Sequence, residues 1–140
     1  MSEEKYKGRK YIVQNYNPDW VDLYNTEADA LRKNIGDQII SIEHIGSTSV
    51  PGLAGKPVID ILVTIQEIET VDSFTETLQH LGYSSLGEYI MEGSRLYIKE
   101  KASERLVNLR FFSQNHKHVA EMLSLRNYLR QHPDIFKFSI

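Results

Sequence analysis

The sequence predicts an α/β (α+β) fold in which a mixed sheet of about five strands carries helices packed on it. Strand-like and helix-like segments alternate along the chain. The run over 58–65 is apolar on both faces, which is typical of a central strand covered on both sides. Further strand-like runs follow one another near the C-terminal end, and we expect them to continue the sheet in antiparallel order.

The first third of the chain predicts two strands and one helix. A short strand is expected over 11–13. Asn17 is a suitable N-cap with Pro18 at the first helical position, and apolar residues then recur at helical spacing until Gly36, where the helix is expected to end. The β-branched run 39–42 predicts the next strand.

The remaining elements follow the central strand. An amphipathic helix is predicted over 67–81 and is closed by Gly82. Three strand-like runs come next, at residues 89–91, 95–99 and 106–112. A last helix, ended by His132-Pro133, places four apolar residues along one side, namely Val119, Met122, Leu123 and Leu129.

Composition restricts the classes of function. The 140 residues are 41% hydrophobic, contain no cysteine and carry a formal net charge of -3. We therefore expect a single domain over 1–140 without thiol catalysis, cysteine-bound zinc or disulfides. Proteins that bind nucleic acids usually carry an excess of basic residues. This chain has a net negative charge, so no nucleic-acid partner is expected. No apolar stretch resembles a signal peptide or a membrane span, so we expect a cytoplasmic protein without a membrane partner.

A loop between two predicted strands carries the strongest chemical signal. The segment 46–57 holds three glycines and three adjacent hydroxyl residues, a composition that suits backbone N–H groups and hydroxyls to binding phosphate. It is not the P-loop of ATPases, because Val50 stands where that motif needs glycine and Pro57 where it needs Ser or Thr. The alternative is a structural loop whose glycines only make turns.

Asp60 interrupts the apolar run of the central strand. A buried carboxylate must be neutralised, paired, hydrogen-bonded or metal-bound, because an isolated buried charge costs several kcal/mol. One interpretation pairs Asp60 with Lys56, Ser47 or Thr48 of the preceding loop. The other makes it a ligand of Mg²⁺, with a loop-bound phosphate supplying further oxygens.

The run from Glu43 to Ile61 resembles the signature of the GrpB family. Further matches are Tyr16-Asn17-Pro18 with Trp20 near the start, and Arg126, Tyr128-Leu129-Arg130 and His132-Pro133 near the end. The family is placed in the nucleotidyltransferase superfamily, which has the fold of DNA polymerase β, and it also occurs fused to dephospho-CoA kinases. The resemblance therefore implies that fold for nearly the whole chain.

The resemblance also implies a site. In nucleotidyltransferases a Gly-Ser pair contacts the triphosphate, an Asp-x-Asp/Glu pair on the next strand holds two Mg²⁺, and a later strand adds a third carboxylate. Gly46-Ser47 and Asp60 match the first two features, but Leu62 occupies the second carboxylate position. Where many GrpB relatives have His-Leu-His, this chain has Asn108-Leu109-Arg110.

Two hypotheses of function follow. The first is a nucleotidyltransferase-fold protein that binds a nucleotide or another phosphate-containing small molecule and transfers a nucleotidyl group with Mg²⁺ held by a catalytic Asp60. The second is a non-catalytic binding or interaction module with a degenerate site. The candidate phosphate-binding residues are His44, Gly46, Ser47, Thr48, Ser49, Lys56, Arg110, Arg126 and Arg130. The acidic residues considered as sources of a missing metal ligand are Glu92, Glu100 and Glu121.

The C-terminal end is apolar around Phe136 and Phe138. Relatives usually continue with a further helical segment, so the chain is expected to be a shortened member of the family. An uncovered apolar patch is readily covered by self-association, which predicts a homo-oligomer.

Overall fold

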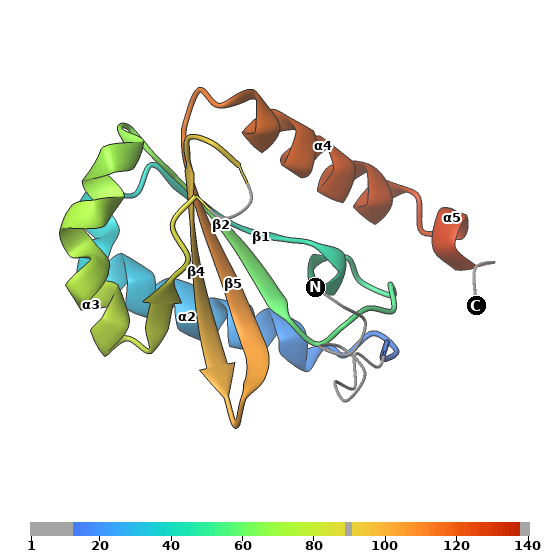
Figure 1. The fold of residues 1–140 in the computed structure, drawn as a ribbon. Coiled ribbons are helices and arrows are strands. Elements are labelled where there is room, and N and C mark those ends of the chain that lie inside the picture. The colour runs from blue at the N-terminus through green and yellow to red at the C-terminus, as the bar shows by residue number, and fades with distance from the viewer. Residues whose placement is uncertain (1–12, 89–90, 138–140) are drawn as a thin grey trace, which may run out of the picture.

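The computed structural model describes residues 13–88 and 91–137 and contains one mixed sheet flanked by helices (Figure 1). The strands are β1 (Ser41–Ile45), β2 (Ile59–Ile65), β3 (Tyr83–Ser85), β4 (Ser94–Lys101) and β5 (Glu104–Ser113). The helices are α2 (Asp19–Ile35), α3 (Thr75–His80), α4 (Lys117–Gln131) and α5 (Asp134–Lys137), with 3₁₀ segments η1 (Gly36–Gln38), η2 (Ser47–Ser49) and η3 (Ile68–Phe74).

The sheet has the order β1-β2-β5-β4-β3. Strands β2 and β5 are parallel and lie at its centre, whereas the other neighbouring pairs are antiparallel. Asp60 is in register with Asn108, and Leu62 with Arg110. Successive side chains of a strand point to opposite faces, so these four side chains share one face of the sheet.

The opposite face carries the main core. Helices α2 and α3 and segment η3 cover it (Figure 1). Ile61 and Val63 of β2 pack there with Phe111 of β5, and all three are fully buried. Helix α2 begins at Asp19, one residue after the predicted first helical position, and the Asn17 side chain accepts a hydrogen bond from the Asp19 N–H at 2.9 Å.

Helix α4 lies over the face that carries Asp60 (Figure 1). A smaller apolar cluster joins Val119 of α4 to Ile45, Leu62 and Phe112 of the sheet. Val119 is the one buried residue of α4, whose later turns stand over a cavity instead of packing closely. This arrangement leaves room for a pocket between α4 and the sheet.

The mixed sheet with packed helices is as predicted, with local differences. The first strand after α2 begins two residues later than expected, at Ser41. The segment predicted as one helix over 67–81 divides into η3 and α3, and the short strand β3 after it was not predicted. The strand expected over 89–91 falls largely outside the described residues, as does most of the one expected over 11–13.

The C-terminal end bears on the predicted apolar patch. Phe136 is half-buried, and a Cβ placed on Gly52 would lie 3.7 Å from its ring. Phe138 lies outside the described residues. Self-association stays a prediction. Among the described residues, none of the helices is long and apolar enough to cross a bilayer.

Candidate functional site

The loop that follows β1 has a conformation that requires glycine at two positions. Gly46 adopts φ +78°, and a Cβ there would come within 2.5 Å of Asp60 Oδ2. A Cβ on Gly55 would collide with the Ser47 hydroxyl. Gly55 is also tied to Gln14 by two backbone hydrogen bonds of 2.8 and 2.9 Å. The glycines therefore bring the loop directly onto Asp60.

Two of the three hydroxyl residues turn inward. Thr48 Oγ1 lies 2.9 Å from His44 Nε2, and the Ser49 hydroxyl donates to the Gly46 carbonyl at 2.5 Å. Thr48 and Ser49 are buried, whereas Ser47 is half-exposed. Thr48 and Ser49 therefore hold the loop in shape, and Ser47 is the hydroxyl residue that lines the larger pocket.

Asp60 is embedded in a network of amide and guanidinium groups. Asn108 Nδ2 donates to Asp60 Oδ1 at 3.0 Å, and Arg110 Nη2 lies 3.6 Å from the same oxygen. Arg105 Nη1 in turn donates to Asn108 Oδ1 at 2.7 Å. Burial raises the pKa of the Asp60 carboxyl, and the Arg110 guanidinium acts in the opposite direction. The interpretation that pairs Asp60 with Lys56, Ser47 or Thr48 is therefore wrong, because its partners are Asn108 and Arg110 of the neighbouring strand β5.

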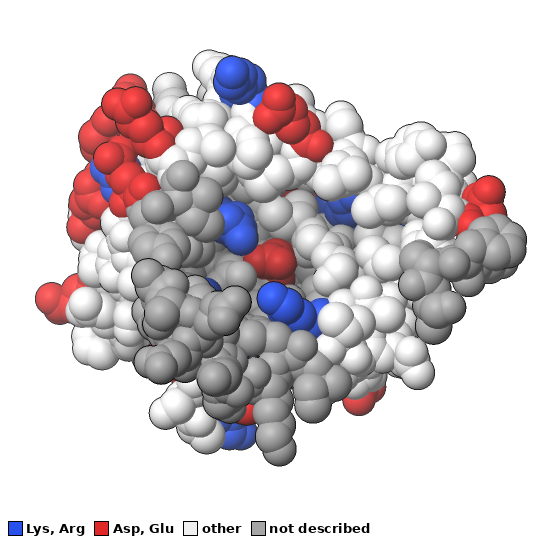
Figure 2. Space-filling view, turned by 45° about the vertical axis from the view of Figure 1, so that its right-hand side comes forward, with Lys and Arg blue, Asp and Glu red and all other residues white. Residues whose placement is uncertain are grey.

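A cavity of about 380 Å³ opens between this network, the loop and α4, and we call it the Asp60 pocket. Its polar lining residues are Ser47, Asp60, Arg110, His118 and Arg126, with Gly46 beside them. Its apolar lining residues are Ile45, Val50, Leu53, Met122, Leu125 and Leu129. Its volume is within the usual range for small-molecule sites. Figure 2 shows a hollowed face in which acidic atoms lie between basic ones. The lining of the Asp60 pocket likewise combines one carboxylate, Asp60, with the two arginines Arg110 and Arg126.

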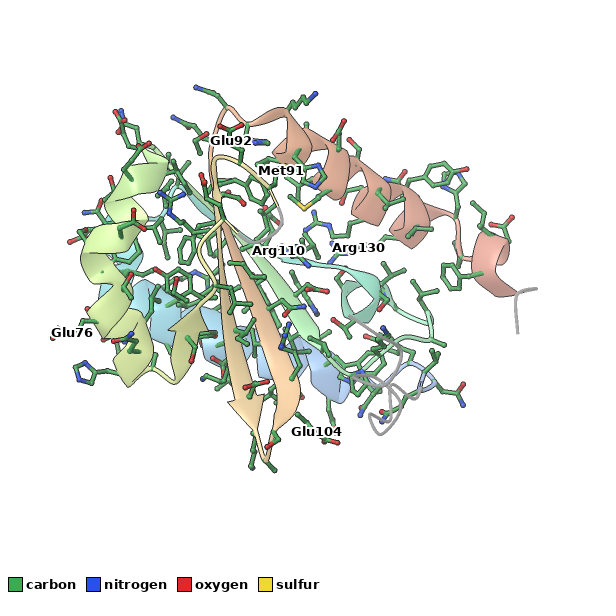
Figure 3. The ribbon with its side chains drawn as sticks, in the orientation of Figure 1. Glu76, Met91, Glu92, Glu104, Arg110 and Arg130 are labelled. Carbon is green, nitrogen blue, oxygen red and sulfur yellow. The ribbon has the colours of Figure 1, made fainter. Side chains whose placement is uncertain are left out.

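Arg126 fixes α4 against the sheet. Its Nη1 donates to Glu43 Oε1 at 2.8 Å and to the His44 carbonyl at 3.1 Å. Its Nε and Nη2 both donate to the Asn127 side chain. Arg126 therefore positions the roof of the Asp60 pocket, and Arg110 is the guanidinium at its floor. Figure 3 shows Arg110 coming from the sheet on the side that α4 overlies.

A second cavity of about 300 Å³ lies between α2 and the loop, and we call it the Tyr24 pocket. Its lining residues are Val21, Tyr24, Asn25, His44, Ser49, Pro51 and Arg130. The two pockets have no lining residue in common within the part of the chain that the structure describes. His44 and Tyr24 stack with ring centroids 4.7 Å apart, and burial together with Arg130 and Arg126 lowers the pKa of His44 to about 4.

The predicted residues are therefore divided by the structure. It brings Gly46, Ser47, Asp60, Arg110 and Arg126 to the Asp60 pocket. His44, Ser49 and Arg130 line the Tyr24 pocket instead. Thr48 is buried in the loop, and Lys56 is exposed and lines neither cavity.

The family model described as GrpB protein matches residues 10–137. The chain belongs to the GrpB family. This confirms the resemblance seen in the sequence. The UPF0157 protein YqkA of Bacillus subtilis (strain 168) is 36% identical over 132 residues, which is 94% of this chain and 38% of YqkA. The chain thus spans well under half the length of that relative.

Solved structures agree with the family. A crystal structure of the conserved protein GrpB from Enterococcus faecalis has a TM-score of 0.84 at 38% identity, covering 89% of this chain and 75% of that one. The Cid1 poly(U) polymerase, in a structure with Mg and 3'-dATP bound, has a TM-score of 0.56 at 15% identity, covering 92% and 43%. The likeness to Cid1 shows that the GrpB chain has a nucleotidyltransferase-like fold.

The residues of this GrpB chain do not fit a pair of magnesium ions. Leu62, at the second carboxylate position, is fully buried in the apolar cluster under α4. Arg110 places a positive charge beside the one carboxylate. Within residues 13–88 and 91–137 no three acidic or histidine side chains gather as a metal site, so Glu92, Glu100 and Glu121 do not complete a set around Asp60.

Several lining residues were not foreseen. Met122 and Leu129 were expected only as apolar residues along one side of the last helix, and they line the Asp60 pocket with Leu125, which is 62% exposed. His118 was not among the candidate site residues, but it lines the pocket and pairs with Glu121 at 3.0 Å. Apolar side chains at i, i+3 and i+7 of one helix give the same pattern in a core and in a pocket wall. This spacing of apolar residues was the signal that the sequence offered for the pocket wall.

Proposed function

We propose that this GrpB-family chain binds a nucleotide or another phosphate-containing small molecule in the Asp60 pocket, without nucleotidyl transfer. The observation that carries the proposal is the Arg110 guanidinium at the pocket floor, which lies 3.6 Å from Asp60 in a pocket that Gly46 and Ser47 also line. A guanidinium offers phosphate up to two parallel hydrogen bonds, and it disfavours a cation at the same place. The likeness in fold to Cid1 supports a nucleotide as the first ligand to test.

The lining of the pocket fits an organic phosphate better than a free ion. The charged lining residues come from the sheet and from α4. Aliphatic side chains such as Val50, Leu53 and Leu129 line the rest of the pocket. Phosphate oxygens would meet Arg110 and Ser47, and the organic part would bury apolar area against the aliphatic wall. We further propose a cytoplasmic location for this binding protein.

The alternative is transfer of a nucleotidyl group with magnesium. Asp60 and Gly46-Ser47 favour it, because they match the metal and phosphate elements of nucleotidyltransferases. The chemistry also needs further carboxylates, and Leu62, Asn108 and Arg110 stand where acidic or metal-binding side chains would be expected. Magnesium binding by Asp60 alone stays a prediction.

A thermal-shift screen tests the binding proposal. Nucleoside mono-, di- and triphosphates are added to the protein in EDTA and, separately, with Mg²⁺. A ligand that binds only the folded state raises the melting temperature in proportion to the logarithm of its concentration over Kd. We expect at least one phosphate compound to raise the melting temperature in EDTA.

Two variants make the screen specific. Arg110→Gln removes the guanidinium from the pocket floor, and losing charge-assisted hydrogen bonds should weaken binding by roughly 10- to 100-fold. Lys117→Gln removes one exposed positive charge at the start of α4 and should leave the shift unchanged. If no compound shifts the transition, or if both variants behave alike, the proposed function is wrong.

A further inference from the structure

Arg130 reaches the second face of the loop from α4. Its Nε donates to the Ser49 carbonyl at 2.9 Å, which fixes the guanidinium at the Tyr24 pocket. Figure 3 shows Arg130 on the side of α4 that is turned towards the loop. A guanidinium has five N–H donors, and within the described part of the chain Arg130 forms one hydrogen bond and no ion pair. Most of its donors therefore remain available to a ligand.

Glu43, the carboxylate whose charge acts on Arg130, already forms an ion pair with another arginine. Glu43 is bound by Arg126 at 2.8 Å, one helical turn before Arg130. Burial and the positive charge of Arg126 lower the pKa of Arg130, and the negative charge of Glu43 acts in the opposite direction. A bound anion would add a negative charge beside Arg130 and would favour its cationic form.

The other walls of the Tyr24 pocket suit a small organic group. Val21 and Pro51 provide apolar surface, and Asn25 adds a hydrogen-bonding amide. His44 forms part of a fixed floor, because it stacks on Tyr24 with an interplanar angle of 4° and lies 2.9 Å from the Thr48 hydroxyl. The cavity of about 300 Å³ is at the lower end of ligand sites.

We propose that the Tyr24 pocket is a second binding site, which takes the carboxylate or phosphate group of a small organic anion on Arg130 and packs the apolar part against Val21 and Pro51. Among residues 13–88 and 91–137, the site shares no lining residue with the Asp60 pocket. It therefore goes beyond the proposed function and does not depend on a ligand being bound there.

Titration followed by ¹⁵N NMR tests the proposal on the whole chain. Benzoate and phenyl phosphate are the probes, because each joins one oxyanion to one apolar ring, and phenol is the uncharged control. We expect the amides of Val21 and Asn25 to shift with one or both anions and not with phenol. The stronger of the two probes identifies whether a carboxylate or a phosphate is preferred.

Variants connect the shifts to Arg130. Arg130→Gln should weaken binding of the preferred probe at least about tenfold, because it removes a charge-assisted pair of hydrogen bonds. Lys117→Gln removes a positive charge from the same helix and should bind like the wild type. If Arg130→Gln fails to fold, Val21→Trp fills the pocket from an exposed position of α2 and should abolish the shifts.

Three results overturn the proposal. The first is that neither anion binds, and the second is that the Arg130→Gln variant binds as tightly as the wild type. The third is that the shifted amides are those of Leu53 and Leu125, which line the Asp60 pocket. That third result would leave the proposed function standing while removing the second site.

Discussion

His44 makes the stability of this protein depend on pH in a predictable direction. The ring is buried between the loop and α2, and burial together with Arg130 and Arg126 lowers its pKa from 6.5 to about 4. The folded state therefore releases the proton of His44 more readily than the unfolded state does. Replacing His44 by Gln retains a hydrogen-bonding amide near Thr48 and removes the titration.

The magnitude follows from the two pKa values. With a folded pKa below the unfolded one, stability from the neutral ring is complete above about pH 6.5 and is lost as the pH falls towards about 4. A difference of about 2.5 pKa units at 1.36 kcal/mol per unit corresponds to about 3 kcal/mol over this window. Such a loss is a large part of the stability of an ordinary domain.

Asp60 titrates with the opposite effect. Its pKa is raised by burial, so the folded state binds its proton more tightly and gains stability as the pH falls. The wild-type curve contains both contributions. The difference between wild type and His44→Gln contains the histidine alone, because Asp60 is present in both proteins.

The assay is urea unfolding followed by the fluorescence of Trp20, a buried residue and the one tryptophan in the chain. The free energy of unfolding is measured at several pH values between about 4.5 and about 7.5 for the wild type, His44→Gln and the exposed control His80→Gln. We expect the wild type and His80→Gln to lose stability in parallel on acidification, and His44→Gln to lose less. Equal pH slopes for all three proteins would refute the reasoning.

Three further predictions concern the loop, the sheet and assembly. Gly46→Ala should lower the free energy of unfolding by about 1–3 kcal/mol, because Gly46 has a positive φ and a Cβ there would collide with Asp60. The control Gly36→Ala, at an open helical position, should leave the free energy of unfolding unchanged. Urea unfolding measures both variants. Leu62→Ala should cost about 2–5 kcal/mol in the same assay, because it leaves a cavity under α4, and an unchanged midpoint would contradict this packing. The predicted self-association should give a dimer mass in light scattering, and a monomer at all concentrations would contradict it.

Much of the fold was predictable because its strongest patterns are local. The doubly apolar run of β2 and the capped, periodic helix α2 both lie close to their expected positions. Strand β3 has the sequence Tyr-Ser-Ser, which contains no alternation to recognise. The predicted bounds of strand β1 were wrong because the polar residues Glu43 and His44 do not look like part of a strand. In the structure Glu43 is bound by Arg126 of α4, and His44 stacks on Tyr24 of α2.

The site was predictable in part. The family signature pointed to Gly46, Ser47 and Asp60, and the departure from His-Leu-His pointed to Arg110; all four line one pocket. Strand register brings Asn108 and Arg110 to Asp60 as alternate residues of β5. The division into two pockets was not predictable, because it depends on η2 turning Thr48 and Ser49 inward. The pocket wall supplied by α4 depends on tertiary placement, which a helical repeat of apolar residues does not determine.

The chemistry of Asp60 also has a consequence for binding. A phosphate beside Arg110 would compete with the Asp60 carboxylate for the same guanidinium and would favour the protonated form of Asp60. Asp60→Asn imitates that neutral form and keeps an oxygen for Asn108. A metal-binding Asp60 would behave in the opposite way, because an amide is a much poorer magnesium ligand than a carboxylate.

Isothermal titration of the best phosphate compound into wild type and Asp60→Asn, each in EDTA and in Mg²⁺, tests the central claim most directly. Binding that does not need metal predicts equal affinity in the two buffers for the wild type, and affinity at least as high for Asp60→Asn. Binding that requires Mg²⁺ and is lost in Asp60→Asn would contradict the claim and assign Asp60 to a metal.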